Sequence, residues 1–316
     1  MIPEWPTFAR RDELWGRFSI CGGLPIRQLF WGRQLFPLCR KASGLQNSHP
    51  GGLRPTGVFA VVAPAPLLSL PPAMSFLRSL LFSIPLIYLS TIVMGALSLA
   101  ASFFDPTGYS QHRIARVWAN MVLAVSFIHV RAEGLDKLDP HGSYVFVANH
   151  ASFMDIPAIL SLLPYQFRFF AKKGLYRIPF LGTHLRRAGH LPVDRSSPRA
   201  SLKSMTAGAR LIAERGISVL LFPEGGRSPH GLREFKDGAA YIAIKAGVPV
   251  VPIAIVGMRR LLPMGSIHIR RGKVVLRAGD PIPTAGLKPS GHTEITQRLY
   301  REVSHLLEEP APTPAR

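Results

Sequence analysis

One histidine and one carboxylate in this sequence have a spacing that could support proton transfer. The apolar stretch Tyr144–Ala148 leads directly into Asn149 and His150, and Asp155 follows five residues after the histidine. A carboxylate on one ring nitrogen fixes the tautomer of an imidazole, which leaves the other nitrogen free to remove a proton. A helix-start aspartate beside a hydrogen-bonded loop histidine would give the same spacing without any chemistry. Taken alone, the pair therefore leaves both interpretations open.

A second loop carries residue types that bind anions. It follows an apolar stretch that ends at Phe222 and reads Pro-Glu-Gly-Gly-Arg-Ser. Paired glycines allow backbone N–H groups to approach an anion, and a guanidinium can bind a phosphate with two hydrogen bonds. We expect Arg227 to bind an anionic group and Glu224 to orient it, although an ordinary turn with a surface arginine is the plain alternative. The candidate binding residues of this loop are Glu224, Gly225, Arg227 and Ser228.

The elements that must position these loops alternate between short apolar runs and amphipathic segments. The predicted strands are Tyr144–Ala148, Phe167–Phe170, Ser218–Phe222, Val250–Val256 and Lys273–Ala278. The predicted helices are Met154–Leu163, Pro198–Glu214, Gly238–Ala246 and His292–Leu307. This interleaving predicts an α/β fold with a mostly parallel sheet flanked by helices. Both loops would then lie at the carboxyl ends of strands, where such sheets bind ligands.

The segment before this domain has the character of a membrane anchor. No charged residue occurs from Ser79 to Phe104, a length that can cross a hydrocarbon core of roughly 30 Å. The following segment, Gln111–Val130, has apolar residues at helical spacing and arginines at its start. We expect a membrane helix, or a two-helix membrane motif whose second helix is amphipathic. A signal peptide and a buried soluble helix are the alternatives, and the run is long for a signal peptide.

The remaining composition sets further limits. The formal net charge of +20 suits anionic membranes, phosphate-bearing substrates or nucleic acid. Cys21 and Cys39 are the only cysteines, so a cysteine nucleophile or a cysteine zinc site after them is excluded. We expect no metal site, because His150 has no accompanying ligands at metal-binding spacing. Ser152 is expected to hydrogen-bond at a helix start rather than to act as a nucleophile, and His184 and His190, which lie among basic residues, are expected to be solvated or interfacial.

The chain divides into four predicted regions. Residues 1–73 contain scattered glycines and prolines and sustain neither a helical nor a strand period. This pattern predicts a disordered extension, or a start codon assigned too far upstream with Met74 as the natural start. Residues 74–130 would form the membrane-anchoring helices and residues 131–309 the catalytic domain. The Pro/Ala-rich tail, 310–316, would be disordered.

Taken together, the motifs resemble those of the glycerolipid acyltransferase family, and specifically the 1-acyl-glycerol-3-phosphate acyltransferases. Four blocks match in the family's order, from about Arg131 to Gly257. They are Asn149-His150-x4-Asp155; Phe169–Leu175 with Ile178–Gly182 and Val193–Arg195; Phe222–Ser228; and Val250–Ala254. The sequence departs from the family at Gly226, where threonine is common, and at Gly174, where glutamate is frequent. These departures leave the acceptor specificity more open than the reaction type.

The resemblance implies a specific reaction and site. It implies transfer of a fatty acyl group from acyl-CoA or acyl carrier protein to the sn-2 hydroxyl of lysophosphatidic acid, which yields phosphatidic acid without a cofactor. His150 would be the general base, Asp155 would orient it, and the acceptor and donor would be bound by the remaining site residues. These residues are Asn149, Lys172, Arg195, Glu224, Gly225, Arg227 and Ser228.

Three alternatives stay open at this stage. Another lysophospholipid or an aminolipid could be the acceptor. A nucleic-acid-binding protein would also suit the charge, but the apolar run and the lack of a recognisable module argue against it, and we expect no nucleic-acid partner. A hydrolase would need an activated nucleophile such as G-x-S-x-G, which does not occur. The expected partners therefore include anionic membrane lipids, and we expect a cytoplasmic membrane location with the catalytic domain on the cytoplasmic side.

Overall fold

The computed structural model describes residues 72–194 and 197–308. The predicted C-terminal tail and all but the last two residues of the predicted N-terminal extension lie outside this part of the chain. The boundary that we placed between residues 130 and 131 remains a prediction.

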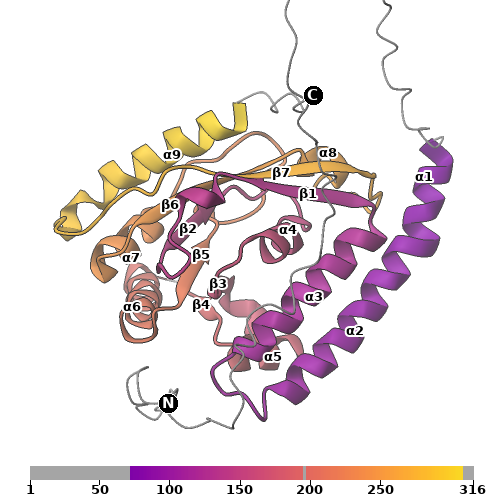
Figure 1. The fold of residues 1–316 in the computed structure, drawn as a ribbon, viewed down its shortest axis with the longest axis horizontal. Coiled ribbons are helices and arrows are strands. Elements are labelled where there is room, and N and C mark those ends of the chain that lie inside the picture. The colour runs from indigo at the N-terminus through magenta and orange to yellow at the C-terminus, as the bar shows by residue number, and fades with distance from the viewer. Residues whose placement is uncertain (1–71, 195–196, 309–316) are drawn as a thin grey trace, which may run out of the picture. The chain divides into compact units, whose positions relative to one another are not determined.

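A seven-stranded sheet forms the centre of the α/β domain (Figure 1). Its strands are β1 (Ile128–Glu133), β2 (Val145–Ala148), β3 (Phe167–Lys172), β4 (Leu191–Val193), β5 (Ser218–Leu221), β6 (Val250–Val256) and β7 (Gly272–Ala278). The strand order is β1-β7-β6-β2-β5-β3-β4, and β6–β7 is the one antiparallel pair of this sheet. The predicted α/β fold with a mostly parallel sheet is confirmed.

Helices cover both faces of the sheet. The α-helices are α1 (Pro72–Arg78), α2 (Ile84–Ala101), α3 (Tyr109–Val125), α4 (Asp155–Leu162), α5 (Leu181–Arg187), α6 (Pro198–Arg215), α7 (Gly238–Ala246), α8 (Met258–Leu261) and α9 (His292–Glu308). Short 3₁₀ segments are η2 (Leu135–Lys137), η3 (Lys173–Arg177) and η4 (Pro289–Gly291), and η1 (Ser79–Ser83) is a π-helical turn. Helices α3 and α4 pack on one face, whereas α6, α7 and α9 pack on the other.

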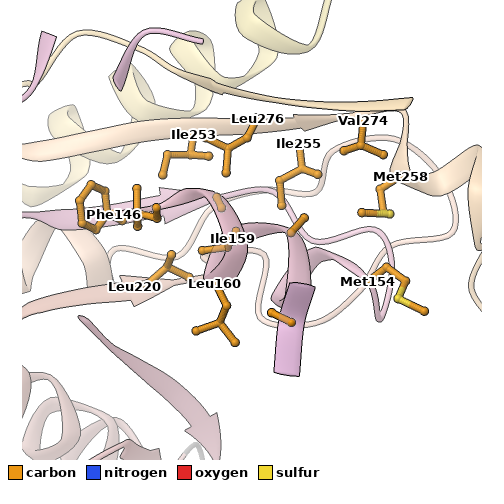
Figure 2. Packing of buried hydrophobic residues seen from close by; sticks show 14 of the residues in the cluster. Phe146, Met154, Ile159, Leu160, Leu220, Ile253, Ile255, Met258, Val274 and Leu276 are labelled. Carbon is orange, nitrogen blue, oxygen red and sulfur yellow. The ribbon is translucent and has the colours of Figure 1, made fainter. Parts of the chain in front are cut away.

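Strand β2 shows how the sheet joins the two cores. Its four residues are all buried, and their side chains alternate between the faces. Phe146 and Ala148 belong to the core under α3 and α4, whereas Val145 and Val147 belong to the opposite core. Figure 2 shows the first core, in which Phe146 lies among residues of the sheet and of α4. Each such buried large side chain contributes about 1.5–3 kcal/mol, so the strand that leads into the His150 loop is firmly held.

One helical segment is long and apolar enough to cross a membrane among the residues that the structure describes. It runs from Ala73 to Ala101, and only 11% of its most apolar window is buried. The π-helical turn before Pro85 accommodates the proline, which lacks an N–H to donate. Helix α3 packs alongside α2, as expected for a two-helix motif (Figure 1).

The amphipathic helix is shorter than predicted. We expected it to reach Val130, but α3 ends at Val125, and Phe127 has a positive φ of 57° that breaks the helical path. From Ile128 the chain enters β1, which pairs with β7 in parallel. β-Branched residues at Ile128 and Val130 suit this strand, and the burial that the pairing gives Ile128 overrides the helical spacing.

Candidate active site

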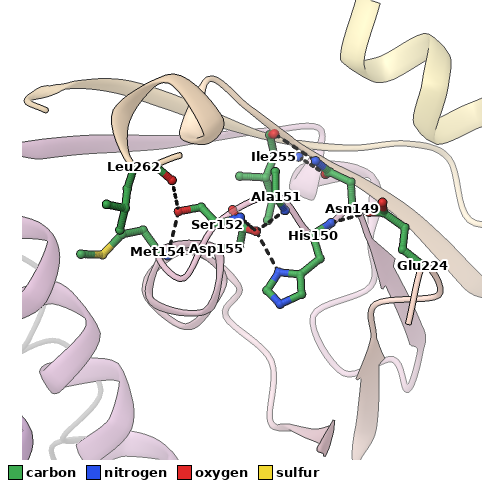
Figure 3. A network of polar contacts seen from close by, with 9 residues as sticks. All are labelled: Asn149, His150, Ala151, Ser152, Met154, Asp155, Glu224, Ile255 and Leu262. Atoms are coloured by element: carbon green, nitrogen blue, oxygen red, sulfur yellow. Dashed lines mark hydrogen bonds and ion pairs between the residues drawn. The ribbon is translucent and has the colours of Figure 1, made fainter. Parts of the chain in front are cut away.

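The loop after β2 is organised by a single carboxylate oxygen. Oδ2 of Asp155 accepts hydrogen bonds from His150 Nδ1 at 2.9 Å, from the backbone N of Ala151 at 2.7 Å and from the backbone N of Ser152 at 2.8 Å (Figure 3). Asp155 is fully buried at the start of α4, where the helix dipole favours a negative charge. The loop thus wraps around the carboxylate and holds the imidazole in one orientation.

The tautomer of His150 follows from these contacts. Two backbone N–H groups already donate to Oδ2 of Asp155, as they would to an ionised carboxylate, and such a group can only accept hydrogen bonds. Nδ1 of His150 must therefore carry the proton, and Nε2 keeps its lone pair. The imidazole also stacks on Phe222, with ring centroids 4.0 Å apart and an interplanar angle of 17°. We did not single out Phe222 from the sequence, although an aromatic residue at a strand end beside a histidine loop was a usable signal.

Three further polar residues hydrogen-bond within the protein and do not line the cavity described below. Asn149 is buried; its Oδ1 accepts from Ile255 N at 2.7 Å and its Nδ2 donates to Ile255 O at 3.3 Å. The expectation that Asn149 contacts substrate is therefore not supported by its geometry. Ser152 accepts from Met154 N and donates to Leu262 O, which agrees with the expected role at a helix start. Ser228 is buried and donates its hydroxyl to His230 O.

The expected pairing of Glu224 with Arg227 is wrong. Oε1 of Glu224 accepts from His150 N at 2.7 Å, and Oε2 accepts from Arg233 N at 3.1 Å. Burial raises the pKa of Glu224, while these two bonds act in the opposite direction. Glu224 thus joins the two loops, because it belongs to the second and holds the backbone of the first. A backbone bond from Ser228 N to His150 O, 3.1 Å long, makes the same connection.

Arg227 is held by an aromatic ring. Its Cζ lies 3.3 Å from the ring centroid of Phe153, and its Nη1 is buried without a hydrogen-bond partner among the described residues. Burial lowers the pKa of Arg227, and the charge of Asp155 opposes that effect. The guanidinium therefore retains donors that an anionic ligand could use.

The glycines of this loop leave space beside Arg227. Gly225 has a φ of +77°, a conformation that side chains rarely tolerate. A Cβ at Gly226 would meet no heavy atom within 4 Å. Glycine at position 226, where the family commonly has threonine, therefore leaves more open space at this point.

Both loops border one cavity of about 1450 Å³. Its wall includes His150, Gly225 and Arg227, together with Lys172 at the end of β3. Helix α2 contributes Ile92 and Leu99 among other residues, and the surface of the cavity is mostly apolar. The structure thus brings the predicted base, the predicted anion-binding arginine and Lys172 to one place. Arg195 lies outside the described residues.

Two histidines that we expected to be solvated or interfacial lie in the cavity wall. His190 accepts from Phe169 N at 3.1 Å, and burial lowers the pKa of its ring well below the usual value. His184 bonds through Nδ1 to Ser98 Oγ on α2 at 3.1 Å, and burial also lowers its pKa. The basic sequence around both residues hid this burial, because the neighbouring arginines point to a solvated surface.

The described residues contain no group of three or more histidine, cysteine or acidic side chains that could hold a metal ion. The polar groups on the cavity wall include the imidazole of His150 and the cationic side chains of Arg227 and Lys172. Such a set can accept a proton and bind an anion.

Comparisons with known proteins agree with this arrangement. Residues 129–256 match the family model described as Acyltransferase, and this range contains both loops. The chain is 38% identical to a chloroplastic 1-acyl-sn-glycerol-3-phosphate acyltransferase of Arabidopsis thaliana over 57% of this chain and 51% of the relative. It is 37% identical to a 1-acyl-sn-glycerol-3-phosphate acyltransferase of Chlamydomonas reinhardtii over 66% of this chain and 62% of the relative. The chain thus spans about half to three fifths of the length of these relatives.

A solved structure shares the fold. The 1-acyl-sn-glycerophosphate acyltransferase PlsC of Thermotoga maritima superimposes with a TM-score of 0.61 and 25% identity, covering 75% of this chain and 100% of that chain. The motif order, the sheet topology and these matches agree: residues 129–256 are similar in sequence to the acyltransferase family model, and the fold is similar to that of a 1-acyl-sn-glycerophosphate acyltransferase.

Proposed function

We propose that this protein transfers a fatty acyl group from a thioester to the sn-2 hydroxyl of 1-acyl-glycerol-3-phosphate and so makes phosphatidic acid. The observation that carries the proposal is that an oriented imidazole, on His150, borders the same apolar cavity as the guanidinium of Arg227, whose Nη1 has no hydrogen-bond partner among the described residues. The names of the relatives, which act on this acceptor class, support the choice of substrate.

The reaction needs one base and no covalent enzyme intermediate. Nε2 of His150 removes the proton of the acceptor hydroxyl as its oxygen attacks the thioester carbonyl. Asp155 stabilises the imidazolium that forms. When the tetrahedral intermediate collapses, the C–S bond breaks, and the imidazolium returns its proton to the leaving thiolate. The products are the ester and the free thiol, and His150 is neutral again.

Arg227 and Lys172 bind the phosphate of the acceptor in this scheme. Within the described part of the chain, Nη1 of Arg227 has no hydrogen-bond partner. Arg227 borders the cavity with His150, so a phosphate held there would place the neighbouring glycerol hydroxyl near the base. Lys172 is exposed at the end of β3 and can add a second positive charge. Two cations favour a phosphomonoester over a zwitterionic headgroup, because the former carries more negative charge.

The donor and the location are part of the same proposal. The donor is acyl-CoA or acyl carrier protein, no cofactor takes part, and the largely apolar cavity suits an acyl chain. The apolar helix Ala73–Ala101 would hold the enzyme at the cytoplasmic membrane. The strongly basic composition favours contact with anionic lipids on the cytoplasmic side rather than with nucleic acid.

An acyl-transfer assay tests the proposal. The full chain in mixed micelles is given lysophosphatidic acid with labelled acyl-CoA or acyl carrier protein, and labelled phosphatidic acid is measured. Lysophospholipids with other headgroups and an aminolipid acceptor are assayed in parallel. Formation of phosphatidic acid in preference to the other products is expected. Equal or faster transfer to another acceptor would refute the acceptor assignment.

The matched variants are His150→Ala and His141→Ala. His141 is an exposed residue in the turn before β2, so its loss should leave turnover unchanged. Loss of the general base should lower turnover by about 10²–10⁴-fold or more. Full turnover by a folded His150→Ala protein would exclude His150 as the base.

A further inference from the structure

The chain between β3 and α5 contains a strained turn that exposes an aromatic side chain. Phe180 has φ 60° and ψ −57°, and Leu181 N donates to Pro179 O at 2.7 Å. This combination is a γ-turn of the rare, strained kind. The Phe180 side chain is nonetheless 78% exposed, so packing in the protein core does not offset the free energy of the strained backbone. An environment outside the described chain is needed to explain an aromatic residue in this position.

Other apolar side chains around Phe180 are exposed as well. Leu175, Ile178 and Leu181 belong to the same short segment, and all three are exposed. We refer to Leu175–Leu181 as the 175–181 segment. Four exposed apolar side chains in seven residues form a contiguous patch in sequence rather than single surface residues, and such patches mark interaction sites.

Helix α5, which directly follows the 175–181 segment, contacts the end of the apolar helix α2. His184 and Arg187 of α5, which follows the segment, bond to Ser98 and Ser102 at the end of α2, each at 3.1 Å. The guanidinium of Arg187 also lies 4.3 Å from the ring centroid of Phe103. Phe103 is 73% exposed, and its neighbour Phe104 is 90% exposed. Two apolar elements from distant parts of the sequence therefore meet at α5.

Within the sequence interval that contains the 175–181 segment, the charged residues have one sign. No acidic residue occurs between Asp155 and Asp194. The exposed cations of this interval include Lys172, Arg177, Arg186 and Arg187. Basic residues around exposed aromatic and aliphatic side chains are the pattern by which proteins bind anionic lipid surfaces.

The cavity lies between the same two elements. Leu175, Phe180 and Leu181 line it from one side, and Ile92 and Gly95 of α2 line it from another. A lipid layer that contacted both elements would therefore adjoin the cavity wall.

We propose that the 175–181 segment inserts into an anionic phospholipid leaflet beside α2, with Phe180 at its tip. The segment then forms a second membrane contact of the catalytic domain. In a step that rests on the proposed function, the acceptor and its acyl chain enter the cavity sideways from the leaflet, between α2 and Phe180.

Site-specific fluorescence tests the insertion. Cys21 and Cys39 are the only cysteines of the full chain, so both are changed to serine, and the environment-sensitive dye NBD is attached at Phe180→Cys. The same label at Leu89→Cys reports on exposed α2, and at Leu287→Cys on an exposed apolar residue of the loop after β7. Vesicles contain phosphatidylcholine with or without phosphatidylglycerol, and some carry nitroxide groups on the acyl chains.

The proposal expects NBD at position 180 to brighten on vesicles with phosphatidylglycerol and to be quenched by acyl-chain nitroxides, as at position 89. The label at 287 should stay in water. A label at 180 that behaves like the one at 287 while position 89 is quenched would overturn the insertion. A response at 180 to monomeric short-chain lysophosphatidate without vesicles, combined with no quenching by acyl-chain nitroxides, would also overturn it, because Phe180 would then contact only bound substrate.

The same preparations separate this inference from the proposed function. If the protein lacking both cysteines transfers acyl groups to lysophosphatidic acid but position 180 stays in water, the insertion fails and the function stands. If position 180 is quenched by lipid but no acceptor is acylated, the function fails and the membrane contact stands.

Discussion

The guanidinium of Arg227 and the ring of Phe153 form a stacked pair, with Cζ 3.3 Å from the ring centroid. Phe153 lies between His150 and Asp155 in the sequence, so the loop that orients the proposed base also supports the proposed phosphate-binding cation. The Phe153 ring is 62% exposed, which suits a platform more than a core residue. One short loop thus sets the positions of both functional groups.

Removing this platform should weaken acceptor binding. Phe153→Leu keeps an apolar side chain but loses the cation–π contact, which contributes about 0.5–2 kcal/mol. We expect the KM for lysophosphatidic acid to rise about 2- to 30-fold with kcat little changed. Phe153→Tyr keeps the ring and should retain the native KM. Steady-state kinetics with both variants checks this, and a native KM in Phe153→Leu would remove Phe153 from the binding machinery.

Asp155→Asn should affect turnover instead. The substitution keeps the shape of the side chain but removes the charge that stabilises the His150 imidazolium, and three donors converge on the lost carboxylate oxygen. We expect kcat to fall by about 10²–10⁴-fold. The control is Asp139→Asn, in a turn where Asp139 Oδ1 accepts from His141 N. Rapid turnover by a folded Asp155→Asn enzyme would show that the pair is structural.

The sequence was informative where contacts are local. His150 and Asp155 are five residues apart, so a strand that ends and a helix that begins between them already bring the two side chains together. Short apolar runs that alternate with amphipathic segments likewise predicted the parallel sheet. The strands of a parallel sheet are buried on both faces and are therefore apolar throughout. Strand β4, with three residues, gave no period that could be recognised.

Contacts between distant segments could not be predicted in the same way. Glu224 has many donors within reach in a folded chain, and the sequence does not show that backbone N–H groups of His150 and Arg233 would bind it in preference to Arg227. The burial of His190 depends on the packing of α2 and α5 around it. The positive φ of Phe180 is also invisible in the sequence, since a bulky residue is the last one expected in such a turn.

A glycine that follows the strained turn should be essential to its shape. A Cβ at Gly182 would lie 2.2 Å from the carbonyl oxygen of Tyr176, a backbone atom that cannot move without disturbing the turn. We expect Gly182→Ala to destabilise the protein by about 1–3 kcal/mol. Gly174 is the matched control, because a Cβ there would meet nothing within 4 Å, and Gly174→Ala should change stability by less than about 0.5 kcal/mol. Thermal unfolding in detergent compares the two, and equal midpoints would contradict the close packing of Gly182 against Tyr176.

A buried histidine outside the reaction should make stability depend on pH. His112 of α3 packs edge-on against Phe167 with ring centroids 4.8 Å apart. Its pKa is lowered to about 3, first by burial and then by the charges of Arg168 and Arg116. In the unfolded chain the pKa returns to about 6.5, so the unfolded state gains a proton below that pH while the folded state does not. The stability that the neutral ring contributes is therefore complete above pH 6.5 and is lost as the pH falls from 6.5 toward 3.

Comparison of variants isolates this effect from other titrations. Between about pH 7 and pH 5, the native protein should lose on the order of 1–2 kcal/mol more stability than His112→Phe, which keeps a ring but cannot be protonated. Thermal unfolding midpoints in detergent at each pH measure the difference. His129→Gln, at an exposed position on β1, should lose stability in parallel with the native protein. If His112→Phe also follows the native curve, His112 takes up its proton in the folded state and the tight packing of α3 against β3 is refuted, because a charged imidazole could not stay in that apolar site.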